Sequence, residues 1–97
     1  MALALHIITR VEMLQPPLAA TLRECIRAQA EAGDEVRVVL LHDAVVRADW
    51  VRSMPEVSGV HPRAEDCRRR GLAVAEESLE DAEIIARLAV AARVASW

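Results

Sequence analysis

One short apolar segment in the middle of the chain constrains the fold more than any other feature. Residues Glu35–Leu41 have the sequence EVRVVLL, in which valine and leucine follow one another with little alternation between polar and apolar positions. Runs of this kind are typical of strands that are covered on both faces, as in the interior of a parallel sheet. We therefore expect this segment to be the central strand of an α/β fold.

The segments around this strand alternate between strand and helix patterns. Along the chain we expect a strand at Ala2–Ile8, a helix that starts at Pro16-Pro17 and stops at Gly33, a weaker strand at Glu56–Val60, a short helix at Arg63–Arg70, a short strand at Leu72–Ala75 and an alanine-rich helix from Ser78 to Ala92. The length of 97 residues suits a single domain, residues 1–97. The alternation predicts a small parallel sheet of about four strands with helices on both faces.

The two longer helices carry apolar residues at helical spacing. The first places on one face Leu18, Leu22, Cys25, Ile26 and Gln29. The last is expected to begin with a capping box in which Ser78 is the N-cap and Asp81 is the acid at position N3. Its apolar face then consists of Ile85, Leu88, Ala89 and Ala92.

The composition excludes several classes of function. Hydrophobic residues make up 54% of the chain, which rules out intrinsic disorder. The 12 basic residues, all arginine, are outnumbered by 15 acidic ones, and Phe and Tyr are absent. We therefore expect no direct nucleic-acid binding, which needs a basic footprint or stacking aromatics. No GxGxxG, P-loop, GxSxG or HExxH motif occurs, and we expect no cofactor.

Cysteine usage and the N-terminal segment predict the compartment. The two cysteines form no CxxC pair, which is typical of a reducing cytosol. The apolar run at the N-terminus ends at His6, too early for a signal peptide or a membrane span. We expect a cytoplasmic protein with no membrane partner. Its high aliphatic content in a small domain predicts an oligomer, formed with itself or with other subunits.

Three histidines lie at or near the carboxyl ends of the first three expected strands. His6, His42 and His61 would therefore share the edge of a parallel sheet where ligands usually bind. Together with Asp43, their imidazoles could form a metal site or a proton-transfer site. Because no local spacing such as HxH or HxxxH occurs, structural or interface roles are the other interpretation.

Cys67 is the candidate for cysteine chemistry. It lies in the sequence EDCRRR, where three arginines and an early helix position would favour a thiolate, the form that sulfur exchange requires. The same charges also have a structural interpretation, because acids in the first turn and arginines in the last complement the helix dipole. Cys25 is expected to be a buried packing residue, which makes Cys67 the more reactive thiol. Trp97 is expected to anchor a contact with another subunit.

Several short stretches, taken in order, resemble one protein family. They are Leu5-His6, Gly33-Asp34-Glu35, Leu40-Leu41-His42-Asp43-Ala44-Val45, Ala64-Glu65-Asp66, Arg70-Gly71-Leu72 and the closing Ala95-Ser96-Trp97. Their order and spacing are similar to those of the DsrE/DsrF/DsrH superfamily of small sulfur-relay proteins, and most of all to its DsrH branch, also called TusB. The resemblance covers nearly the whole length of the chain.

The resemblance implies a small α/β fold and a place in a hetero-oligomer with two related DsrE/DsrF-type subunits. Such complexes pass persulfide sulfur between cysteines, toward tRNA 2-thiolation or in sulfur oxidation. In the DsrE/TusD branch the sulfur-bearing cysteine lies eight residues before the Gly of an Arg-Gly pair, and this chain has Arg63 there. The DsrH branch usually carries Gln-Asp-Gly where this chain has His42-Asp43-Ala44.

The departure at Arg63 implies a non-catalytic or accessory subunit without independent enzymatic activity. If the chain carries sulfur at all, we expect it on Cys67. The alternative interpretation, from a different class, is a stand-alone α/β protein that binds a metal or a small anion at the edge formed by His6, His42 and His61.

Overall fold

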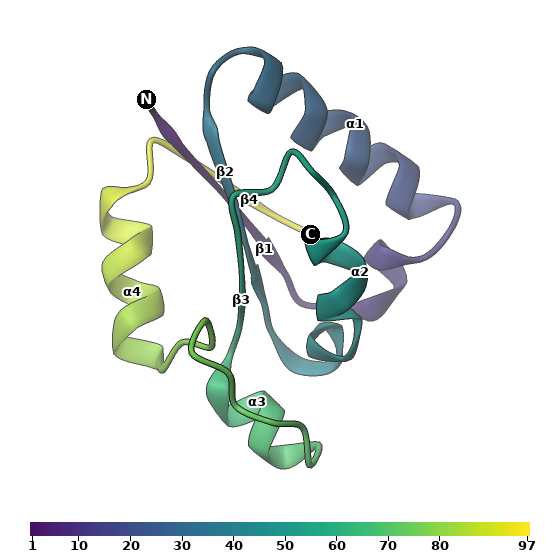
Figure 1. Ribbon diagram of the computed structural model, residues 1–97, viewed down its shortest axis with the longest axis vertical. Coiled ribbons are helices and arrows are strands. Elements are labelled where there is room, and N and C mark those ends of the chain that lie inside the picture. The colour runs from purple at the N-terminus through teal and green to yellow at the C-terminus, as the bar shows by residue number, and fades with distance from the viewer.

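The chain forms a four-stranded, entirely parallel sheet with the strand order β3-β2-β1-β4 (Figure 1). The computed structural model describes all 97 residues. The strands are β1 (Leu3–Ile8), β2 (Glu35–Leu40), β3 (Gly59–Pro62) and β4 (Arg93–Ser96). The apolar segment predicted to be central is β2, which pairs with β1 on one side and β3 on the other. The α/β class, the parallel sheet and the interior position of this strand are confirmed.

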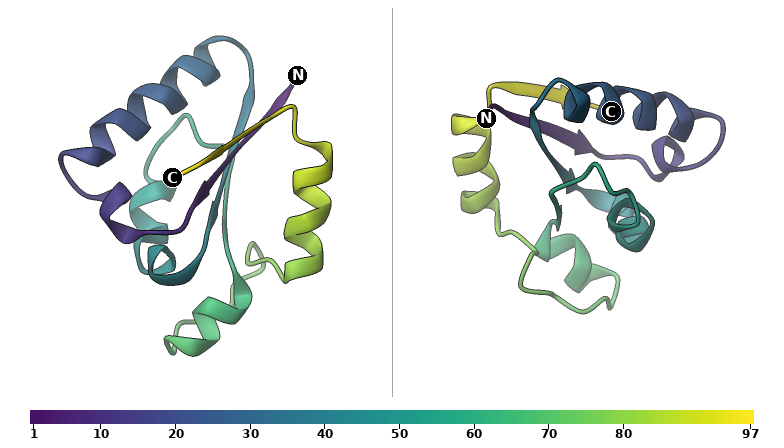
Figure 2. Two further views of the ribbon diagram at one scale, coloured as in Figure 1. Left: turned by 180° about the vertical axis from the view of Figure 1, so that it is seen from behind. Right: turned by 45° about the horizontal axis from the view of Figure 1, so that its top comes forward.

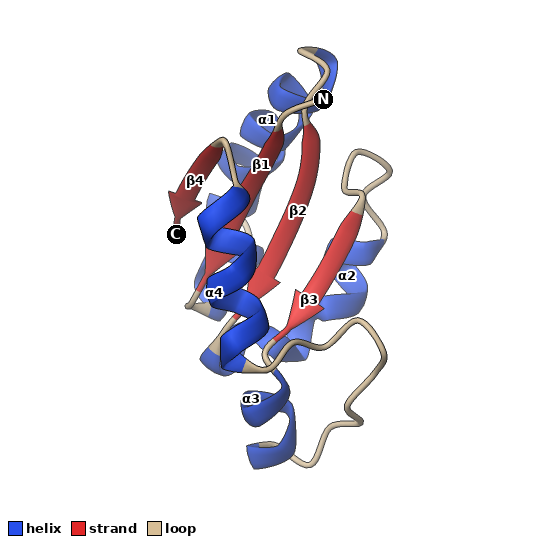
Figure 3. Ribbon diagram, turned by 90° about the vertical axis from the view of Figure 1, so that its left-hand side faces the viewer, coloured by secondary structure: helices blue, strands red, loops and turns tan.

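Helices cover both faces of this sheet, as predicted. One face carries α1 (Leu18–Glu31) and α2 (Ala48–Arg52), together with the 3-10 helices η1 (Val11–Leu14) and η2 (His42–Arg47). The opposite face carries α4 (Asp81–Val90), and α3 (Ala64–Arg69) lies beyond the carboxyl end of β3 (Figures 2 and 3). None of these helices is long and apolar enough to cross a membrane.

The two faces of the sheet bury very different amounts of apolar surface. Under α1 and α2 lies a core of 16 buried residues, which includes Leu22 and Ile26 of α1 and Val36 and Val38 of β2. Under α4 the buried cluster has only four members, Leu5, Val39, Leu79 and Ile84. Because side chains alternate between the faces of a strand, β1 and β2 contribute to both clusters. Most of the hydrophobic stabilisation therefore comes from the α1 face.

The C-terminal third of the chain differs from the prediction. Leu72–Ala75 was expected to be a strand, but it lies in an exposed loop between α3 and α4. The fourth strand is β4, in the segment directly after the last helix. That helix ends at Val90 because Ala91 is extended, and the backbone then bonds to β1 through Ala92 N–H and Leu3 C=O at 2.9 Å. The third strand also begins later than expected, at Gly59.

The last helix begins later than predicted, which changes its buried face. Its N-cap is Glu80, whose backbone N–H is accepted by the Glu83 side chain at 3.0 Å. The expected capping box of Ser78 and Asp81 is therefore wrong. Ile84 is buried on the sheet, whereas Ile85, which was predicted to be buried, is 65% exposed.

This correction predicts different costs for two neighbouring truncations. We expect Ile84→Ala to lower the free energy of unfolding by about 2–4 kcal/mol, because it leaves a cavity against β1 and β2. Ile85→Ala removes a largely exposed side chain, and we expect about 0.5 kcal/mol or less. Urea denaturation of both variants measures the difference. Equal losses would show that α4 is rotated from the position described.

Candidate functional site

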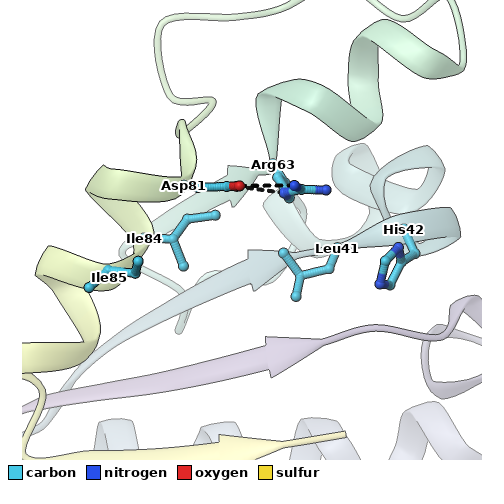
Figure 4. Close-up of a pocket in the computed structure, with 6 residues that line it drawn as sticks. All are labelled: Leu41, His42, Arg63, Asp81, Ile84 and Ile85. Atoms are coloured by element: carbon cyan, nitrogen blue, oxygen red, sulfur yellow. Dashed lines mark hydrogen bonds and ion pairs between the residues drawn. The ribbon is translucent and has the colours of Figure 1, made fainter.

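A pocket opens between the carboxyl ends of β2 and β3. After β2 the chain enters η2 and α2 on one face of the sheet, whereas after β3 it passes through α3 and a long loop before it reaches α4 on the opposite face (Figure 3). Between the ends of β2 and β3 and the beginning of α4 lies a pocket of about 390 Å³. Its lining consists of Leu41, His42, Arg63, Asp81, Ile84 and Ile85 (Figure 4).

Arg63 is fixed in the wall of this pocket by two carboxylates. Its Nε and Nη2 donate to the two carboxylate oxygens of Asp81, at 2.7 and 3.0 Å. Its Nη1 donates to Oδ2 of Asp66 at 3.3 Å. The hydrogen bond with Asp81 is the main reason that the pKa of Arg63 is raised, and it also lowers the pKa of Asp81. This bidentate contact connects the end of β3 to the beginning of α4.

Asp66 is a buried carboxylate with one oxygen left without a partner. Its side chain is 1% exposed, and Oδ2 accepts the backbone N–H of His42 at 2.8 Å. Burial alone would raise the pKa of Asp66, but the hydrogen bonds from His42 and Arg63 outweigh burial, and the pKa is lowered. The other oxygen, Oδ1, has no hydrogen bond. The nearest nitrogen atoms of basic side chains are His42 Nδ1 at 3.8 Å and Arg70 Nη1 at 3.9 Å.

His42 holds a backbone conformation that residues other than glycine rarely adopt. Its φ is 52°, in the left-handed region, directly after β2. Such strain persists where the surroundings fix it, and it gathers at functional sites. The hydrogen bond from His42 N–H to Asp66 is one of the contacts that fix it here. The imidazole, which is more than half exposed, stands at the edge of the pocket (Figure 4).

The other two histidines lie on opposite faces of the sheet. His6 is buried on the α1 face, where its Nδ1 accepts the indole N–H of Trp97 at 2.9 Å and its Nε2 bonds to the side chain of Gln29. His61 is buried on the α4 face and bonds to Glu77 C=O at 2.9 Å and to Arg37 Nη1 at 3.1 Å. Burial is the main cause that lowers the pKa of both.

The three histidines are therefore not brought together. Asp43, the carboxylate expected to join them, accepts the backbone N–H of Val11 instead. No group of three or more His, Cys, Asp or Glu residues has the arrangement of a metal site. The hypothesis of a shared metal or anion site for His6, His42 and His61 loses its geometric basis. Only His42 lines a pocket.

Trp97 docks within its own chain rather than projecting outward as an anchor. Besides its hydrogen bond to His6, its ring stacks on the imidazole with 6.0 Å between ring centroids. It also packs against the larger core. This contact holds the end of β4 in place, and a role of Trp97 in anchoring another subunit stays a prediction.

The environment of Cys67 differs from the one expected. The residue is 3% exposed and belongs to the larger core. Burial raises the pKa of its thiol, so the thiolate is disfavoured. The neighbouring arginines do not reverse this, because Arg68 pairs with Glu80 and Arg69 with Glu65. Cys67 instead forms part of the wall of a second pocket, of about 310 Å³, beside η2. A sulfur-carrying role for Cys67 stays a prediction.

Cys25 is the more accessible thiol. It is partly exposed on α1, whereas it was expected to be buried. We therefore expect iodoacetamide to alkylate Cys25 faster than Cys67 in the native protein, because Cys67 is both less accessible and held as a thiol. Mass spectrometry over a time course measures both rates, and the two should become similar in denaturant. Faster alkylation of Cys67 would contradict the burial described here.

The two buried histidines predict how stability depends on pH. Because folding lowers the pKa of His6 and His61, the unfolded chain binds more protons than the folded one below about pH 6.5. The free energy of unfolding should therefore be highest above this pH. It should fall as the pH is lowered toward the pKa values of His6 and His61 in the folded protein. Urea denaturation at a series of pH values measures the slope.

The contribution of His6 to this pH dependence of the free energy of unfolding can be measured with a variant. His6→Gln keeps a polar side chain between Trp97 and Gln29 but does not titrate, so we expect a smaller slope. The double variant with His61→Gln should reduce it further. A slope unchanged in both variants would show that neither histidine is held neutral by folding.

No protein-family model, curated protein or solved structure matches this chain significantly. The resemblance to the DsrE/DsrF/DsrH superfamily therefore stays a hypothesis that rests on the sequence motifs alone.

The sequence analysis identified His42 and Arg63 as notable positions. It did not identify Asp66 and Asp81, the two carboxylates that position them. Asp66 was interpreted only as an acid in the first turn of a helix, together with Glu65. Asp81 was assigned to the wrong position of a capping box. The strand order would not have indicated this site either, because in the order β3-β2-β1-β4 the direction of the connections reverses between β1 and β4, whereas the pocket lies at the ends of β2 and β3.

Proposed function

We propose that this protein is an accessory, non-catalytic subunit of a sulfur-relay complex that transfers persulfide sulfur, linked to tRNA 2-thiolation or sulfur oxidation. Its partners would be small DsrE/DsrF-type subunits. The proposal rests on the resemblance of the ordered motifs, and the small parallel α/β fold is compatible with it.

The side chain of Arg63 is the observation that carries the accessory role. It occupies the position where the DsrE/TusD branch has its sulfur-bearing cysteine, and its guanidinium is held by Asp66 and Asp81. Neither thiol of the chain lines the pocket at this position. A subunit with this site has no nucleophilic sulfur to offer there, so it would act through contacts with its partners.

A surface that suits such contacts lies along α4 and β4. We call it the α4–β4 flank and define it by Ile85, Leu88 and Val94, which are 65%, 37% and 49% exposed. Ile85 and Leu88 are three residues apart and share one side of α4. Beside them β4 pairs only with β1, so its outer edge has free backbone groups (Figure 3). Exposed apolar side chains next to an open sheet edge are typical of an association surface.

The alternative function, a stand-alone protein with a histidine-edged metal or anion site, is not favoured by any contact. His6 and His61 are each saturated by other partners, on opposite faces of the sheet. We therefore propose only the accessory role.

Co-expression with two DsrE/DsrF-type proteins from the same organism tests this proposal. We expect the chain to co-purify with them in a complex much larger than the 10.7 kDa of the single chain, measured by light scattering. Val94→Glu, which places a charge on the α4–β4 flank, should weaken the complex about tenfold or more.

Val46→Glu is the matched control for this test. Val46 lies on η2 away from the flank, and its exposure of 53% is close to that of Val94. We expect this variant to assemble normally. A chain that stays monomeric with every such protein would overturn the proposed function, and equal effects of both variants would overturn the choice of surface.

A further inference from the structure

We propose that the pocket between β2 and β3 receives the thiol of a partner cysteine, and that His42, oriented by Asp66, accepts the proton of that thiol. The identification of the ligand as a partner's cysteine rests on the function proposed above. The assignment of His42 and Asp66 to a proton-accepting pair rests on the geometry of this chain alone.

The unpartnered oxygen of Asp66 sets the orientation of the imidazole. Oδ1 is buried, needs a donor and faces His42 Nδ1 at 3.8 Å. A small rotation of the half-exposed imidazole brings an Nδ1–H group into hydrogen-bond range of that oxygen. The other nitrogen, Nε2, is then without a proton and free to accept one. The strained backbone of His42, bonded to the same carboxylate, keeps the ring beside it.

The charges around the pocket favour a neutral donor over an anion. Arg63 contributes one positive charge, whereas Asp66 and Asp81 contribute two negative ones. Arg63 also has its Nε, Nη1 and Nη2 atoms engaged by these carboxylates, so it offers little to a phosphate or carboxylate ligand. Arg70 is the other cation near Asp66, at 3.9 Å, and it does not line the pocket.

The walls of the pocket favour a thiol among the neutral donors. Leu41, Ile84 and Ile85 make half of the lining aliphatic. Sulfur is soft and polarizable and packs well against apolar groups. A thiol is also far more acidic than an alcohol, with an ordinary pKa of about 8.5, so an imidazole can remove its proton near neutral pH. The pocket volume of about 390 Å³ accommodates a cysteine side chain and part of its backbone.

The proposed step is a proton transfer and nothing more. The S–H bond breaks and its electron pair stays on sulfur, while a new N–H bond forms at Nε2 of His42. The products are a thiolate and an imidazolium, whose positive charge faces the carboxylate of Asp66. This chain itself forms no covalent bond to sulfur, in agreement with an accessory role. The thiolate is the nucleophilic form in sulfur exchange.

Nuclear magnetic resonance of the imidazole nitrogens tests the pair in the isolated chain. We expect the free protein to show His42 with the proton on Nδ1 and none on Nε2. N-acetylcysteinamide, a neutral mimic of a cysteine residue, should then shift the Nε2 resonance in a saturable manner. N-acetylmethioninamide has sulfur but no S–H group, and it should leave Nε2 unshifted.

Two variants separate the roles of the pair. Asp66→Asn presents an amide N–H group to Nδ1 and should move the proton to Nε2, which we expect to weaken binding of the thiol about tenfold or more. His42→Asn tolerates the left-handed backbone and should abolish the response, which is followed on the amide resonances of Leu41 and Ile85. It provides a second test if Asp66→Asn does not fold.

Three outcomes would overturn the proposal. These are a proton on Nε2 in the free protein, an unshifted Nε2 at saturating thiol, and equal shifts with the methionine analogue. None of these measurements requires a partner subunit. A positive result combined with failure of complex formation would therefore refute the sulfur-relay role but leave the thiol pocket standing.

Discussion

The buried carboxylate of Asp66 is the constraint on which the functional edge of this protein depends. It lies in α3, after β3, but it accepts the backbone N–H of His42, which follows β2. It also holds Arg63, which in turn binds Asp81 at the beginning of α4. One carboxylate therefore connects the ends of two strands and, through Arg63, the helix on the opposite face. Charge-assisted hydrogen bonds of this kind are stronger than neutral ones and repay part of the cost of burying the charge.

The unequal burial of the two sheet faces separates stability from function. The large core under α1 and α2 supplies most of the apolar burial, and it includes Cys67. The α4 face has a small apolar cluster, and around it lie the pocket, the ion pairs and the α4–β4 flank. A helix that buries little of its own surface leaves side chains such as Ile85 available for a ligand or a partner. The protein can thus present a chemically varied face without weakening its main core.

The sequence predicted those parts of the fold that depend on local patterns. The apolar run of β2, the alternation of element types and the glycine at the end of α1 all act over a few residues, and the structure agrees with each. It did not predict β4, because Arg93–Ser96 becomes a strand only through pairing with the open edge of β1. It also misplaced the beginning of α4, where two capping patterns overlap and tertiary burial of Leu79 and Ile84 selects the later one.

The candidate site could be predicted only in part for the same reason. The position of His42 at the end of a central strand is visible in the sequence, and so is Arg63. The role of Asp66 depends on a contact across 24 positions of the chain, which no local pattern reveals. Cys67 was misjudged because the adjacent arginines suggest an open, electropositive environment, whereas packing places the thiol inside the core.

A crystal structure of the assembled complex would test the central claim most directly. The account predicts that a partner subunit inserts a cysteine between the ends of β2 and β3, with its sulfur in hydrogen-bond contact with His42 Nε2 and the imidazole bonded to Asp66. A complex in which this pocket faces solvent, or is filled by a side chain without a thiol, would contradict it.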